Sequence, residues 1–161
     1  MSQTVLITGA SNGIGKACAR VFARKGYDLV LVARHREKLE AVKAELSEYD
    51  VQIKVIAMDL TGEDAAVDLY NNLVLDDISI DILVNNAGFG DHGAFHDSSW
   101  EKQKKMVLLN IVALMQMTYV FGQSMKRRKK GRILNVASIA GLCAGPYMST
   151  YYATKAFVLS F

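Results

Sequence analysis

The amino-acid sequence predicts an α/β fold in which one parallel β-sheet is covered by helices on both faces. Short apolar runs of strand length alternate along the chain with longer segments whose apolar residues recur at helical spacing. Glycine follows the first apolar run at Gly9 and ends the first helical segment at Gly26. Parallel strands are joined by crossover helices, so this alternation predicts a doubly wound sheet.

The predicted elements follow one another in a regular order along the whole chain. The expected strands are 5–8, 29–33, 52–58, 80–85 and 132–138, and the expected helices are 14–24, 37–46, 63–75, 99–126 and 150–161. Right-handed crossovers should connect the five strands. No repeat, low-complexity stretch or linker interrupts the pattern, so residues 1–161 are expected to form a single domain.

The composition favours a folded intracellular protein. Of the 161 residues, 51% are hydrophobic and only one is proline, which argues against disorder. A formal net charge of +3 is too small to indicate nucleic-acid binding by itself. Cys18 and Cys143 fit no disulfide or metal spacing, and residues 1–4 show no start of a signal sequence. We therefore expect a cytoplasmic protein that binds no nucleic acid.

Three segments allow a second interpretation. Residues 106–122 are apolar enough to suggest a membrane span, but the segment is short and contains polar side chains, so we expect a helix buried against the sheet and a second subunit. The cations at 126–130 suggest nucleic-acid binding, but they also suit the solvated end of a helix. His92 and His96, with acids beside them, suggest a metal site, but a glycine in a loop separates them, and we expect no metal.

A glycine-rich turn lies between the first strand and the first helix, where residues 8–15 read T-G-A-S-N-G-I-G. Gly9 permits a tight turn, Gly13 allows the backbone to approach a pyrophosphate, and Gly15 allows the helix to pack close to the sheet. The helix start offers unpaired N–H groups to phosphates. Taken alone, the turn could also be an ordinary strand–helix connection.

Further motifs occur in a fixed order after this turn. The spacing T-G-x-x-x-G-x-G is followed by N-N-A-G at 85–88, Asn110 in the long helix, Ser138 after the fifth apolar run, and Y-x-x-x-K at 151–155. Over its whole length the chain resembles the short-chain dehydrogenase/reductase family. The resemblance implies a Rossmann-type sheet and a nicotinamide cofactor. The cofactor contacts that it implies are Gly9, Ser11, Asn12, Gly13, Ile14, Gly15, Asp59, Leu60, Asn86, Tyr151 and Lys155.

The last motif carries the chemistry of proton transfer. A free tyrosine has a pKa of about 10, too high for a base at neutral pH. Lys155 lies four residues after Tyr151 on the same helix face, where its charge can favour the tyrosinate. Ser138 would donate a hydrogen bond to the substrate oxygen. By resemblance, Asn110 positions Lys155 and a water, and Lys155 also binds the nicotinamide ribose. An exposed helical pair is the alternative for Tyr151 and Lys155.

The end of the second strand predicts NADP rather than NAD. NAD enzymes usually place an acid there to bind the ribose 2′-hydroxyl, whereas this chain has Ala33 followed by Arg34, His35 and Arg36. Arg34 could bind a 2′-phosphate through two hydrogen bonds. A solvated basic corner is the alternative.

The expected function is hydride transfer between NADP(H) and a carbonyl or secondary alcohol, with Tyr151 as general acid and base. Family members continue past the Y-x-x-x-K motif through two more strands and a substrate loop, so a chain ending at Phe161 is expected to be incomplete. The alternative is a truncated, non-catalytic dinucleotide-binding module. We expect a small-molecule substrate, no membrane association and a homo-oligomer in the complete form. The loops at the carboxyl ends of the strands suggest an apolar or aromatic substrate group through Phe89, Phe95, Leu142, Pro146 and Tyr147.

Overall fold

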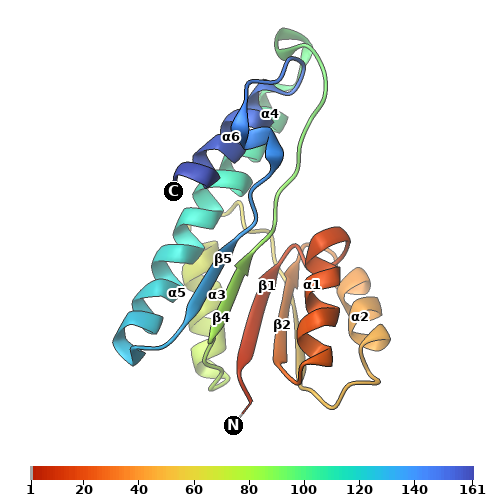
Figure 1. The fold of residues 1–161 in the computed structure, drawn as a ribbon, viewed down its shortest axis with the longest axis vertical. Helices are drawn as coiled ribbons and strands as arrows, with labels where there is room; N and C mark the ends of the chain where they lie inside the picture. Colours follow the sequence, from red (N-terminus) through yellow and green to blue (C-terminus); the bar gives the residue numbers. More distant parts are fainter. Residues whose placement is uncertain (1) are drawn as a thin grey trace.

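A five-stranded parallel sheet, in the order β3-β2-β1-β4-β5, forms the centre of the computed structural model, which describes residues 2–161 (Figure 1). The pairing is in register, with Val5 of β1 opposite Leu29 of β2 on one side and Ile82 of β4 on the other. The strands are β1 (Thr4–Thr8), β2 (Asp28–Ala33), β3 (Ile53–Ala57), β4 (Ile82–Asn85) and β5 (Arg132–Asn135). This arrangement confirms the predicted doubly wound fold.

The helices lie on both faces of the sheet, with α1 and α2 on one side and α3 and α5 on the other (Figure 1). The helices are α1 (Gly13–Arg24), α2 (Arg36–Glu45), α3 (Ala65–Leu75), α4 (Trp100–Val107), α5 (Leu114–Arg128) and α6 (Ser149–Ser160). A π-helical segment, η2 (Leu108–Ala113), joins α4 to α5. Two 3₁₀-helices are η1 (Phe95–Asp97) and η3 (Ile139–Leu142).

Alternating residues of the strands supply two separate cores. Leu6 of β1 and Leu83 of β4 pack into the core on the α3 and α5 side, where Phe121 is buried. Val5 and Ile7 point the other way, into the core under α1 and α2. Because a strand turns successive side chains to opposite faces, apolar runs without a polar alternation are the pattern that a sheet covered on both faces requires.

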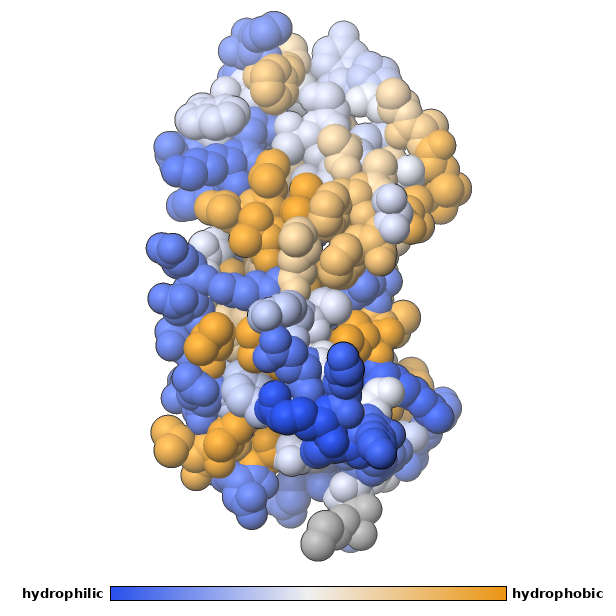
Figure 2. All heavy atoms as spheres, turned by 90° about the vertical axis from the view of Figure 1, so that its left-hand side faces the viewer, coloured by the Kyte–Doolittle hydropathy of each residue, from blue (hydrophilic) through white to orange (hydrophobic). Residues whose placement is uncertain are grey.

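By length and composition alone, the long helical segment Trp100–Arg128 could cross a membrane. In the fold it packs along the sheet, with Met106, Met117 and Phe121 fully or almost fully buried. It also exposes apolar side chains, among them Val112 and Met115. Figure 2 shows an apolar band across this side of the molecule, above a strongly hydrophilic patch.

The cations at 126–130, which close this helix and follow it, are exposed, as expected for the solvated end of a helix, and two of them also pair with an acid. Arg128 and Lys130 lie 3.3 and 3.1 Å from Asp81, just before β4. Burial alone would raise the pKa of Asp81, but hydrogen bonds from Lys130, the Thr4 amide and Arg128 outweigh it, so the pKa is lowered. The ion pairs of Arg128 and Lys130 therefore connect the end of α5 to the amino end of the sheet.

Candidate functional site

The glycine-rich turn has the geometry of an anion site. Gly9 and Gly13 adopt φ values of 65° and 50°, in the left-handed region that favours glycine. A Cβ on Gly15 would lie 2.3 Å from the Gly9 carbonyl oxygen, so a side chain at 15 would separate α1 from the turn. Asn12 caps α1 without a side-chain hydrogen bond, and no acidic residue lies in the first turn. The N–H groups at the start of α1 are therefore available to an anion.

The segment after β4 holds this turn in place. Asn86 Nδ2 donates to the carbonyl oxygens of Thr8 and Gly9, at 3.0 and 3.2 Å. Thr8 Oγ1 in turn accepts the backbone N–H groups of Asn86 and Ala87. The N-N-A-G motif and the glycine-rich turn are thus one hydrogen-bonded unit. The side-chain amide of Asn86 stabilises the turn by binding its carbonyl oxygens.

A cavity of about 280 Å³ opens beside the turn, at the carboxyl ends of β1, β2 and β3. It is lined by Gly9, Ser11, Asn12, Arg34, His35, Lys38, Asp59, Leu60 and other residues. Three of these residues are basic, namely Arg34, His35 and Lys38. Lys38 was not singled out from the sequence, although its place in the first turn of α2, four residues after Arg34, was a usable signal.

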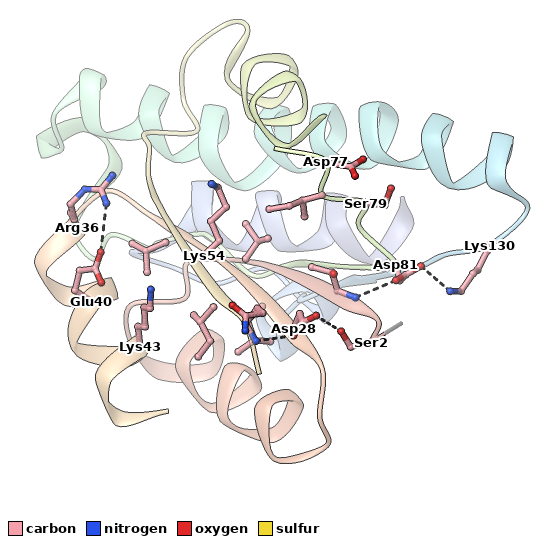
Figure 3. Close-up of a pocket in the computed structure, with 17 residues that line it drawn as sticks. Ser2, Asp28, Arg36, Glu40, Lys43, Lys54, Asp77, Ser79, Asp81 and Lys130 are labelled. Carbon is pink, nitrogen blue, oxygen red and sulfur yellow. Dashed lines mark hydrogen bonds and ion pairs between the residues drawn. The ribbon is translucent and has the colours of Figure 1, made fainter. Parts of the chain in front are cut away.

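Arg36, the third basic residue of the sequence motif, points elsewhere. Its guanidinium lies 3.6 Å from Glu40, and both side chains line a different hollow (Figure 3). That hollow, of about 940 Å³, runs beside α2 and β3 to the amino ends of the strands. Its acids are largely paired within the wall, as Asp28 is with Gln52 N and Asp81 with Lys130. It lies away from the glycine-rich turn, so we do not assign the cofactor to it.

Asp59 adds a negative charge to the cavity beside the glycine-rich turn. Burial alone would raise its pKa, but hydrogen bonds from Thr61 N and Oγ1, at 3.0 and 2.9 Å, and the nearby charges of Arg34 and Lys105 lower it. The carboxylate is therefore an ionised acceptor at the edge of the cavity, and neighbouring Leu60 supplies an apolar surface there.

Asn110 lies in the π-helical segment and is 1% exposed. Its Nδ2 donates to the Phe89 carbonyl oxygen and to Thr154 Oγ1, at 2.9 and 3.0 Å, and its Oδ1 accepts the Phe89 amide at 3.1 Å. The described contacts include no direct hydrogen bond from Asn110 to Lys155, but Thr154 precedes Lys155 on α6. The π segment was not predicted; such bulges widen a helix locally and are frequent at functional sites.

Tyr151 and Lys155 lie one turn apart on α6, as their spacing predicted. The Lys155 ammonium lies over the Tyr151 ring, 5.9 Å from its centroid, and donates to the Val136 carbonyl oxygen at 2.8 Å. Burial lowers the pKa of Lys155. Gly88 leaves room beside this pair, since a Cβ there would lie 3.8 Å from Lys155 Nζ and 2.9 Å from Asn110 Oδ1.

Ser138 follows β5 in extended conformation, since the strand itself ends at Asn135 rather than at 138 as predicted. Ser138 Oγ accepts the Ala140 amide at 3.1 Å, which fixes the oxygen and leaves the hydroxyl hydrogen free to donate. The following η3 packs against α6, because a Cβ on Gly141 would lie 2.6 Å from the Lys155 carbonyl oxygen. The serine segment and the lysine are therefore neighbours.

Tyr152 meets the Tyr151 ring edge to face, with ring centroids 6.4 Å apart, but its main packing lies elsewhere. Its ring packs against Gly145, where a Cβ would approach it to 2.3 Å. It lines a separate apolar hollow of about 560 Å³ with the loop 141–146, including exposed Cys143. Among residues 2–161, no cluster of three or more His, Cys, Asp or Glu could hold a metal ion. His92 stacks on Tyr147, and His96 contacts Phe95 instead.

The whole described chain matches a known protein family. Residues 3–161 match the family model for short chain dehydrogenases. A very-long-chain 3-oxoacyl-CoA reductase of Bos taurus is 34% identical over 98% of this chain and 52% of its own length. A 17-beta-hydroxysteroid dehydrogenase type 3 of Mus musculus is 38% identical over 100% of this chain and 53% of its own. The chain therefore spans about half the length of the curated relatives it matches.

Solved structures show the same similarity. A bulky-bulky ketone specific alcohol dehydrogenase from Comamonas testosteroni superposes with a TM-score of 0.90 at 39% identity, over 98% of this chain and 64% of that one. A short-chain dehydrogenase from Sphingobium yanoikuyae, solved in complex with NADPH, superposes with a TM-score of 0.91 at 40% identity, over 98% and 62%.

Proposed function

This chain belongs to the short-chain dehydrogenase family, and from that premise we propose that it is the cofactor-binding and proton-transferring part of an NADP(H)-dependent oxidoreductase. The reaction is the reduction of a ketone to a secondary alcohol, or its reverse. Hydride is added to the carbonyl carbon while a proton is added to the carbonyl oxygen, and bound NADPH would supply the hydride.

The residues around the cavity beside the glycine-rich turn fit a dinucleotide that carries an additional phosphate. The uncapped start of α1 and the open space at Gly13, where a Cβ would meet no atom within 4 Å, suit the pyrophosphate. Arg34 and Lys38 suit the 2′-phosphate, because both line the cavity and no acid stands at position 33. Asp59 and Leu60 suit the adenosine end of the cofactor. These residues support NADP in preference to NAD.

Three side chains take part in the proton transfer, and Asn110 helps to position them. Ser138, with its oxygen already bonded to Ala140 N, donates its hydrogen to the substrate carbonyl oxygen. Tyr151 delivers the proton to that oxygen, and the cationic Lys155 stabilises the tyrosinate that remains. Asn110 acts through Thr154, which ties the long helix to α6.

The observation that carries this proposal is the packing of η3 against α6. Gly141, three residues after Ser138, contacts the Lys155 backbone, while the Lys155 ammonium reaches back to Val136 on the same chain segment. The donor and the proton-transfer pair thus come from adjoining surfaces at the carboxyl end of the sheet. Catalytic groups held on packed elements keep the geometry that hydride transfer requires.

For the substrate we propose a ketone with bulky apolar groups. Phe89, Phe95, Leu142, Pro146 and Tyr147 come from the two loops that lead to α4 and α6. Relatives whose names specify a 3-oxoacyl-CoA, a hydroxysteroid and a bulky-bulky ketone point in the same direction. We further propose a cytoplasmic homo-oligomer, which would cover exposed apolar residues of the long helical segment, such as Val112 in η2 and Met115 in α5.

The second candidate function is a dinucleotide-binding module without turnover. This alternative is retained because the chain spans only about half the length of its curated relatives. The test uses the protein expressed from the open reading frame that encodes this chain. NADPH binding is followed by fluorescence, and NADPH oxidation by absorbance with benzil and diacetyl as ketones. Turnover with either ketone supports the oxidoreductase, whereas tight NADPH binding without turnover across a wider ketone panel supports the binding module.

A further inference from the structure

Tyr147 adopts an unfavourable backbone conformation four residues before Tyr151. Its φ of 61° lies in the left-handed region, where a bulky side chain is uncommon and costs free energy. Glycine would occupy the position without that cost. A strained residue of this kind is retained where the surrounding structure holds it, and such residues cluster at functional sites.

The contacts of Tyr147 join the two loops that lead to α4 and α6. Its ring stacks on His92 with a centroid distance of 5.8 Å and an interplanar angle of 27°. Its carbonyl oxygen accepts the Gly93 amide at 2.8 Å. The next residue reaches the same loop, since a Cβ on Gly90 would lie 3.1 Å from Met148 Cε. The residue that carries the left-handed φ is thus also the one that stacks on His92 and binds the Gly93 amide.

The joined loops lie beside the proposed proton donor. A Cβ on Gly90 would lie 3.2 Å from Cγ and Cδ2 of Tyr151, so the backbone at 90 covers one side of that ring. The preceding loop, 141–146, lines the separate hollow that also contains Tyr152. Tyr147 contacts the same loop at His92 and Gly93 and remains 60% exposed, so the stacked pair offers free aromatic surface on the loop that covers Tyr151.

We propose that the stacked Tyr147–His92 pair forms a wall of the substrate site and selects ketones that carry a flat, bulky apolar group. The inference rests on the proposed function and names its specificity determinant. An aromatic face contacts a planar group over a large area, and this contact is made equally in the bound substrate and in the transition state. The pair therefore acts on KM for bulky ketones and leaves the proton transfer unchanged.

The test compares Tyr147→Gly, Tyr147→Phe and the control Asp77→Gly in the protein expressed from the whole reading frame. Asp77 also has a left-handed φ, 56°, but lies in the turn after α3, which is not one of these two loops. Benzil represents a ketone that carries flat, bulky phenyl groups, and diacetyl a small one. Tyr147→Gly should raise KM for benzil about tenfold or more, with kcat for both diketones and KM for diacetyl within about twofold of wild type. Tyr147→Phe, which keeps the ring, should restore the benzil KM.

Thermal denaturation separates this role from a structural one. Tyr147→Gly removes backbone strain, so its Tm should not fall, and Asp77→Gly should leave both KM values unchanged. Equal losses with benzil and diacetyl, or an unchanged benzil KM, would overturn the inference. If wild type reduces neither diketone, the proposed function fails instead. Calorimetric binding of benzil to the NADP⁺-saturated protein then decides the inference, with weaker binding expected only for Tyr147→Gly.

Discussion

The side-chain amide of Asn110 donates a hydrogen bond to Thr154 Oγ1 across 3.0 Å and so joins the long helix to α6 one residue before Lys155. The same amide holds the backbone of Phe89 through both its oxygen and its nitrogen. Thr154 Oγ1 in turn donates to the Tyr151 carbonyl oxygen at 2.8 Å. One buried side chain therefore connects the loop after β4 with the helix that carries Tyr151 and Lys155.

Replacing this amide should destabilise the protein strongly. Asn110→Leu leaves the Phe89 N–H and C=O groups and one contact of Thr154 without a partner, and we expect a loss of about 2–4 kcal/mol in the free energy of unfolding. Urea denaturation measures it. Asn71→Leu on the exposed side of α3 is the control and should change stability by less than about 0.5 kcal/mol. Equal effects of the two substitutions would show that the Asn110 network contributes little.

Gly90 should control the position of the Tyr151 ring. A methyl group at 90 would lie 3.2 Å from the ring, a distance that forces a shift of a few tenths of an ångström. We expect Gly90→Ala to lower kcat about tenfold, because proton transfer depends on the placement of the tyrosine hydroxyl, and to leave NADPH affinity unchanged. Gly62→Ala, whose Cβ would make an ordinary contact at 3.7 Å, is the control. An unchanged kcat in Gly90→Ala would show that the ring moves freely.

Tyr151 and Tyr152 should differ sharply in their effect on turnover. Tyr151→Phe removes the proposed proton donor and should lower kcat by about 10²–10⁴, with NADPH affinity nearly unchanged. Tyr152→Phe keeps the ring that packs on Gly145 and should be close to neutral. Steady-state kinetics with the better ketone of the panel provides the comparison. A larger effect at Tyr152 would reverse the assignment of the general acid.

The Asp81 cluster should make stability depend on pH in the acid range. The lowered pKa of Asp81 means that its ionised form is favoured in the folded state, so its contribution is present above the unfolded pKa of about 3.9 and is lost as pH falls through the lower folded value. At neutral pH, Asp81→Asn should therefore be less stable than wild type by about 1–3 kcal/mol, a difference that should shrink below about pH 4. Urea titrations at both pH values measure the difference. Exposed Asn71→Ala, which removes no titratable group, is the control and should show no such pH-dependent gap.

The order and type of the main elements could be predicted from the sequence because buried strands and amphipathic helices leave periodic patterns. The boundaries differed mainly at strand ends: the predicted strand 132–138 is a strand only to Asn135, since Val136 makes one further bond to Asn85 O before the chain leaves the sheet. Short 3₁₀ segments such as η3 carry no periodicity long enough to read.

The candidate site was predictable where motif spacing determines neighbours along one helix, as with Tyr151 and Lys155. The π segment around Asn110 was not, because it depends on the partners that the amide finds in Phe89 and Thr154. The direction in which a long side chain points could not be predicted from the sequence either. Sequence order placed Arg36 beside Arg34, yet the start of α2 turns Arg36 toward Glu40.

That difference leads to a prediction about cofactor choice. Arg34 and Lys38 line the cavity beside the glycine-rich turn, whereas Arg36 lines the hollow along β3. A 2′-phosphate adds negative charge that only a cation within the cavity can bind directly. Arg34→Ala and Lys38→Ala should therefore weaken NADPH binding about tenfold or more, since a hydrogen bond to a charged group contributes about 1.5–3 kcal/mol, while NADH binding should change little.

Arg36→Ala is the matched control, because it removes a positive charge from the same turn at a residue that does not line the cavity. Its NADPH affinity should stay within about twofold of wild type at moderate ionic strength, where exposed charges more than about 10 Å apart are screened. Fluorescence titration with NADPH and NADH, repeated at higher salt, distinguishes the cases. If Arg36→Ala weakens NADPH binding as much as Lys38→Ala does, the net charge of the corner governs affinity and Lys38 is no direct ligand. If Lys38→Ala alone is neutral, Arg34 binds the phosphate without it.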